Sequence, residues 1–99
     1  MIRGTTPTHV FTLPFDVELI ADLRISYGQN NGEIICKTID DCTLNGNTIS
    51  VTLTQEDTYK FNCGQQAKAQ VKIRTHAGDV LASEFIFISV ERCLNEEVI

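Results

Sequence analysis

Cysteine and histidine are the residue types of this chain with the most diagnostic chemistry, because both bind metals and both take part in nucleophilic catalysis. The candidates are Cys36, Cys42, Cys63, Cys93, His9 and His76. The cysteines lack the paired Cys-x-x-Cys spacing of a structural zinc site, and two histidines are too few to complete one. Cys36 and Cys42 flank a turn across which a disulfide is conceivable, but the spacing favours separate thiols. His9 lies on an apolar strand face and His76 in a turn, so neither is placed as the base of a cysteine nucleophile.

Pairs of acidic residues are the other candidates for chemistry. Asp40-Asp41 and Glu56-Asp57 lack the alternating oxygen ligands of a calcium loop. The first pair is typical of a turn and the second of a helix start, where negative charge is favourable. The sequence contains no glycine-rich phosphate loop and no Ser-His-Asp pattern. It therefore predicts no catalytic residue, no metal, no cofactor and no enzymatic activity.

The elements that would position these residues are short β-strands, because polar and apolar residues alternate in nearly every segment. The expected strands cover residues 8–15, 23–27, 33–39, 47–53, 67–74 and 80–90. Asn31-Gly32 and Asn45-Gly46 are typical of tight turns between strands. The alternation breaks only near residues 54–61, where Thr54 and Asp57 have the spacing of a capping box and predict a short helix.

This pattern predicts an all-β protein, an immunoglobulin-like antiparallel β-sandwich of about seven strands with one short helical turn. A partly open barrel is the alternative. We expect a single domain over residues 1–99, with an N-terminal tail at 1–7 and a C-terminal tail at 91–99. The predicted core contains Phe11, Leu13, Leu23, Ile25, Ile49, Val51, Leu53, Phe61, Val71, Ile73, Phe85 and Phe87.

The strand VLASEFIFISV, residues 80–90, is apolar on both faces, so one face remains after the other enters the core. An uncovered apolar strand near a sheet edge invites pairing with a second chain. We therefore predict an interface with another protein molecule. It is formed by Ile86, Ile88 and Val90 together with Leu94, Val98 and Ile99 of the tail. The alternative is that the tail folds back on its own domain.

Composition limits the classes of partner. The net charge is −5 and the eight basic residues are spread along the sequence, which argues against nucleic-acid and anionic-membrane binding. No apolar run approaches the ~20 residues of a membrane span. The N-terminus has neither an apolar core nor a small-residue cleavage site, so we expect no signal peptide and synthesis in the cytoplasm with reduced cysteines.

The C-terminal half, LTQEDTYKFNCGQQAKAQVKIRTHAGDVLASEFIFISVERCL, carries a family resemblance. It resembles the small β-sandwich structural proteins of phages and prophages of Gram-positive bacteria, and is most similar to the N-terminal domain of siphophage baseplate upper proteins. The shared pattern is a turn, an alternating strand, a glycine hairpin and a second strand that opens with small residues. The matching residues are Gly64, Ala69, Val71, Ile73, Gly78, Ser83, Phe85, Phe87 and Val90.

The resemblance implies a virion component of the tail or baseplate, which assembles with itself as a homo-oligomer and with other phage structural proteins. Baseplate upper proteins continue into a long second region that this sequence lacks. The expectation is therefore a short structural protein of the kind encoded beside prophage tail genes. Two alternatives remain open. One is a carbohydrate- or surface-binding module, for which Tyr27 and Tyr59 are the candidate aromatic platform, and the other is a small cytoplasmic inhibitor of a host protein.

Overall fold

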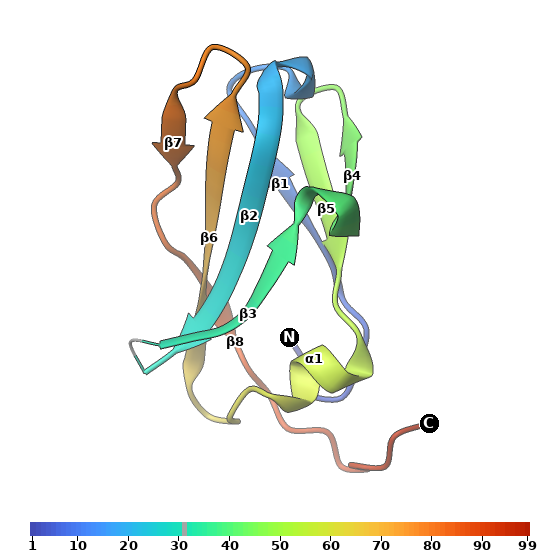
Figure 1. Cartoon of the computed structure of the whole chain (residues 1–99). Coiled ribbons are helices and arrows are strands. Elements are labelled where there is room, and N and C mark those ends of the chain that lie inside the picture. The colour runs from blue at the N-terminus through green and yellow to red at the C-terminus, as the bar shows by residue number, and fades with distance from the viewer. Residues whose placement is uncertain (31) are drawn as a thin grey trace.

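The computed structural model describes residues 1–30 and 32–99, and within these residues it forms a sandwich of two antiparallel sheets (Figure 1). The strands are β1 Thr8–Thr12, β2 Ile20–Gln29, β3 Gly32–Thr38, β4 Cys42–Asn45, β5 Thr48–Thr52, β6 Gln66–Thr75, β7 Val80–Ala82 and β8 Ile86–Ser89. The helical elements are the 3-10 turns η1 Val17–Leu19 and η2 Ile39–Asp41 and the helix α1 Gln55–Tyr59. The predicted all-β sandwich with one short helix is confirmed. None of the helices in the described residues is long and apolar enough to cross a membrane.

The chain passes from one sheet to the other three times. One sheet has the order β1-β5-β4, and the other has the order β3-β2-β6, with β7 and β8 both paired to β6. The chain passes between the sheets at η1, at η2 and at α1, while each hairpin stays within one sheet. The second strand lies between the third and the sixth here, whereas it lies between the first and the fifth in immunoglobulin constant domains.

Side-chain caps begin the helical elements at the points where the alternation of polar and apolar residues breaks. Asp16 accepts a hydrogen bond from the Glu18 amide at 2.8 Å and so begins η1. The predicted capping box is present at α1, with Thr54 Oγ1 accepting from the Asp57 amide and Asp57 Oδ2 from the Thr54 amide, both at 3.0 Å. Asp57 also accepts from Lys37 Nζ at 2.7 Å, which ties α1 to β3. Glu56-Asp57 is therefore the start of a helix, as predicted.

Two of the predicted turns need comment: one contains an unpredicted strand, and the other includes a residue outside the described part of the chain. The sequence predicts an Asn-Gly turn within residues 40–47 and no strand before it, but Cys42–Asn45 forms β4 and pairs with β5. Four residues with two half-buried side chains give too short an alternation to recognise in the sequence. The Asn31-Gly32 turn rests on Asn31, which lies outside the described residues, although Gln29 pairs with Gly32 as a β2–β3 hairpin requires.

The core lies between the sheets and largely matches the prediction. Nine predicted residues are buried, namely Phe11, Leu23, Ile25, Ile49, Val51, Leu53, Phe61, Val71 and Ile73. Leu13 is partly buried and packs against them. The prediction was wrong for Phe85 and Phe87, which are 54% and 58% exposed.

A β-bulge explains why Phe85 and Phe87 face outward. In β7, Ala82 pairs with Lys72, so an unbroken strand would place Phe85 opposite Ala69. In β8, Ile86 pairs with Ala69 instead, which shows that one extra residue lies between the two strands. A shift of one residue turns every side chain to the other face. The alternation of residues 85–90 was therefore predicted correctly, but its inward and outward sides were exchanged.

Candidate interaction surface

Ser83 holds the bulge in place. Its amide donates to the Val71 carbonyl at 2.8 Å, and its hydroxyl accepts from the Val71 amide at 3.0 Å and donates to the Glu84 carbonyl. The Gln70 side-chain amide donates to the Ser83 carbonyl at 2.9 Å. The side chain of Ser83 thus replaces the backbone acceptor that β6 loses where the ladder is interrupted. The sequence predicts no structural role for Ser83, which is named there only among the residues of the family resemblance.

The residues predicted to form an interface divide into two groups. Ile86 and Ile88 face the inner side of the sheet beside Ala69 and Ala67, and Val90 is 4% exposed within the core. The prediction of an uncovered face at these positions is wrong for Val90, Ile88 is half-buried against the core, and Ile86 remains 40% exposed. The remaining group is Leu94, Val98 and Ile99, all of which are exposed.

Half of the basic residues lie together on the outer face of the larger sheet. Arg24 pairs directly with Lys72, and Lys68 and Arg74 share its face because they alternate with the buried residues of β6. Phe87 pairs with Lys68 and so points outward with it. We call this surface the cationic face, formed by Arg24, Lys68, Lys72, Arg74, Phe85 and Phe87. The inference from the sequence that the basic residues are scattered is wrong, because β2 and β6 are distant in sequence and adjacent in the sheet.

The charges on the cationic face are incompletely neutralised. Asp22 Oδ1 accepts from Arg24 Nη1 at 2.7 Å, and this hydrogen bond lowers the pKa of Asp22. The Lys68 ammonium lies 5.2 Å from the centroid of the Phe85 ring. Within residues 1–30 and 32–99, no ion pair includes Lys68, Lys72 or Arg74. The face is therefore positive although the whole chain is negative.

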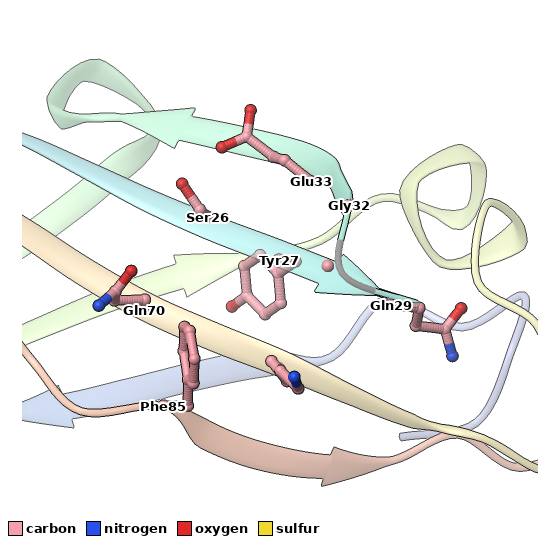
Figure 2. Close-up of a pocket in the computed structure, with 9 residues that line it drawn as sticks. Ser26, Tyr27, Gln29, Gly32, Glu33, Gln70 and Phe85 are labelled. Carbon is pink, nitrogen blue, oxygen red and sulfur yellow. The ribbon is translucent and has the colours of Figure 1, made fainter.

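An open groove of about 350 Å³ lies at the end of this face that carries Lys68 and Phe85. Figure 2 shows Ser26 of β2, Gln70 of β6 and Phe85 along the groove, with Glu33 of β3 at its other side. Tyr27 belongs to the same stretch of β2, but its side chain is fully buried. Phe85 consequently supplies an exposed ring beside polar groups, which is a combination suited to binding a peptide or another protein.

Residues 94–99, which we call the tail segment, carry exposed apolar side chains on a backbone that is held in place. The Tyr59 hydroxyl donates to the carbonyls of Glu96 and Glu97 at 2.7 and 3.1 Å. Arg3 bonds the Glu96 carboxylate and lies over the Tyr59 ring. Leu94 and Ile99 are nevertheless 97% and 96% exposed. The domain thus fixes the position of this segment through polar groups and leaves its apolar side chains in solvent.

The half-buried His9 and the buried Tyr27 form a polar pair between the sheets. His9 Nδ1 lies 2.7 Å from the Tyr27 hydroxyl, linking β1 to β2 across the core. Burial, and next the N-terminal ammonium, lowers the pKa of His9. Burial is also the main cause that raises the pKa of Tyr27, followed by the charges of Cys42 and Asp57. A neutral histidine bonded to a neutral tyrosine in the core is a structural link between the sheets, as expected for a histidine on an apolar strand face.

The other candidate residues are dispersed. Cys36 and Cys63 are exposed, Cys42 and Cys93 are half-buried, and all four are thiols. His76 is exposed beyond β6, and its amide bonds the Leu19 carbonyl. Asp41 accepts hydrogen bonds from the amide and hydroxyl of Thr38, as turn chemistry predicts. Across the described part of the chain, no group of three or more His, Cys, Asp and Glu side chains is placed to hold a metal ion.

No family model matches the chain, and neither a curated protein nor a solved structure gives a significant match.

Proposed function

We propose that this protein is a non-enzymatic assembly subunit of a phage or prophage particle, from the tail or baseplate, and that it acts through contacts with other copies of itself. The resemblance of its C-terminal half to baseplate domains supports its assignment to a phage tail or baseplate. The observation that carries the proposal is the exposure of Phe85 and Phe87 side by side with Lys68 on the cationic face.

Exposing large aromatic side chains to water on a sheet face is unfavourable in free energy unless another surface covers them. A strand that presents two large apolar side chains to water exposes a surface prone to association. The bulge at Ser83 is a specific hydrogen-bonded feature, and its effect is to turn these rings outward. The two exposed phenylalanines also match the composition of interface centres, which are rich in aromatic side chains.

The carbohydrate-binding alternative has less support from the same surface. Its candidate platform consisted of Tyr27 and Tyr59, but Tyr27 is buried and bonded to His9. Tyr59 bonds the tail segment and lies under Arg3. Neither ring is available as an open stacking surface, so the assembly function is the better account of the exposed residues.

Light scattering after size-exclusion chromatography tests this function. We expect the wild-type protein to exceed the monomer mass and its mass to rise with concentration. The double variant Phe85→Ser/Phe87→Ser should remain a monomer with its thermal transition preserved, because both side chains are exposed. Val10→Ser, at an exposed apolar residue of β1, is the matched control and should assemble like the wild type. A wild-type protein that stays monomeric at ~1 mM, where contacts of about 4 kcal/mol are half formed, would refute the proposal.

A further inference from the structure

We propose that the cationic face binds the tail segment of a second copy of this chain, so that assembly is head-to-tail. This inference rests on the proposed function, and it names the two surfaces that meet. The tail segment is LNEEVI, residues 94–99, and its neighbour's receiving surface is the outer side of β2 and β6 with Phe85 and Phe87.

The two surfaces are complementary in charge. Four of the eight basic residues lie on the cationic face, and the net charge of the chain is −5, so all other residues together carry −9. The tail segment contributes Glu96 and Glu97 within six residues and has no basic residue, and because Arg3 of the same copy pairs with Glu96, Glu97 is the carboxylate that can attract a neighbour. A positive face on one copy and a negative segment on another attract each other, and two positive faces repel.

They are also complementary in apolar character. The tail segment exposes Leu94, Val98 and Ile99, and the cationic face exposes Phe85 and Phe87, with Val80 on the same side opposite Arg74. The acidic pairs Asp40-Asp41 and Glu56-Asp57 have no exposed large apolar residue next to them in the sequence, and Asp16 and Glu18 at η1 have one, Leu19. The tail segment combines two acidic residues with three exposed large apolar side chains that can cover the two rings.

The lengths agree. Six residues of extended chain span roughly 20 Å, and Lys68 and Arg74 are six positions apart along β6, which is also roughly 20 Å. The tail segment can thus lie along the full row of cations. Phe85 and Phe87 flank the Lys68 end of that row.

A second copy is the occupant because the segment points away from its own cationic face. Tyr59 and Arg3 hold Glu96 and Glu97 at the α1 end of the sandwich. From there the chain runs below α1 and away from β2 and β6 (Figure 1). Binding its own face would require breaking these contacts and reversing direction, whereas a neighbouring copy can bind the segment where it already lies.

A contact between two different surfaces has a consequence for the size of the assembly. After the first contact, one copy keeps an unused face and the other an unused segment, so the oligomer grows to a closed ring or a filament. A self-complementary contact between two cationic faces would stop at a dimer. We therefore expect masses beyond the dimer in the wild-type protein.

Mixing two damaged variants tests the pairing. The face variant is Phe85→Ser/Phe87→Ser, and the segment variant is Val98→Ser/Ile99→Ser, which keeps the Glu96 contacts and alters only exposed side chains. Neither should assemble alone, because each lacks one of the two surfaces. Their equimolar mixture should form a dimer and nothing larger, since one intact face then meets one intact segment. Val10→Ser serves again as the control.

Charge exchange provides a second measurement. Lys72→Glu and Glu97→Lys should each weaken assembly several-fold in sedimentation equilibrium, and the double variant should recover part of the loss. Lys60→Glu, at an exposed lysine that follows α1 and does not belong to the cationic face, makes the same change in net charge as Lys72→Glu and should have little effect. If the segment variant assembles like the wild type, this inference is overturned while the proposed function stands. If the mixture stays monomeric although the wild type assembles, the head-to-tail contact is likewise excluded. A wild-type monomer at ~1 mM would instead remove the proposed function itself.

Discussion

Replacing Ser83 with alanine should loosen the bulge that turns Phe85 and Phe87 outward. The hydroxyl is the acceptor for the Val71 amide at 3.0 Å, while the Ser83 amide to Val71 carbonyl bond does not depend on the side chain. Ser83→Ala therefore leaves one main-chain donor in a buried strand without its partner. A buried donor that loses its acceptor costs about 1–3 kcal/mol. Ser83 is only half-buried, so water can partly replace the hydroxyl, and we expect about 1–2 kcal/mol.

The expected loss is measurable in two ways. For a domain of this size, each kcal/mol lowers the melting temperature by about 4–8 °C, so the midpoint should fall by roughly 4–16 °C. Denaturant unfolding should show a lower midpoint with an unchanged slope, because the surface exposed on unfolding is the same. Hydrogen exchange at the Val71 amide should accelerate more than at the Ile73 amide, which lies further along the same strand.

Two matched substitutions separate the hydroxyl from the position. Ser83→Thr retains the acceptor and should stay close to the wild type in stability. Ser89→Ala removes an exposed hydroxyl from β8 and should change the unfolding free energy by less than about 0.5 kcal/mol. The reasoning is refuted if Ser83→Ala melts with the wild type and the Val71 amide keeps its protection, because the hydroxyl would then have no part in fixing the bulge.

Three further results are expected. Leu53→Ala, at a fully buried residue, should lower the unfolding free energy by about 2–5 kcal/mol in denaturant unfolding. Phe85→Ala should lower it by about 1 kcal/mol or less, because that ring is exposed and contacts Lys68. Equal losses for the two variants would contradict the assigned faces. Burial lowers the pKa of His9 from 6.5, so its neutral form stabilises the fold fully above pH 6.5 and this stability is lost as the pH falls towards the lower, folded-state pKa. The unfolding free energy of His9→Gln should therefore depend less on pH between 6.5 and 5 than that of the wild type, and parallel curves would show that His9 does not contribute. Gly28→Ala should destabilise the β2–β3 hairpin, because the added methyl group would overlap the Gly32 carbonyl oxygen; a normal melting temperature would show that the turn adjusts freely.

The sequence was informative wherever one local pattern determined the structure. Ile49, Val51 and Leu53 alternate with threonine and serine, and this alternation alone identifies the buried side of β5. The capping box of Thr54 and Asp57 likewise depends on two residues three positions apart. Both features were predicted because their physical cause lies within a few residues.

Features that depend on pairing between distant segments were not predictable in the same way. The direction of Phe85 depends on one extra residue between β7 and β8, and that count becomes visible only when each strand is aligned with β6. The cationic face likewise requires Arg24 to lie opposite Lys72, across a sequence separation that no local pattern spans. A usable signal did exist in β6, where Lys68, Lys72 and Arg74 alternate with buried residues and thus share one face.

The bulge at Ser83 also determines which residues of the C-terminal hairpin can serve in assembly. Without the extra residue, Phe85 and Phe87 would lie opposite Ala69 and Ala67 and would enter the core, and the sheet would present isoleucines beside Lys68 instead. An isoleucine has no ring face with which a lysine ammonium can interact, whereas Phe85 lies 5.2 Å from Lys68 Nζ. The extra residue thus places aromatic rings and cations on one surface. Because Ile88 and Val90 pack on the core side while Phe85 and Phe87 face outward, this part of the chain contributes to the core and to the cationic face at the same time.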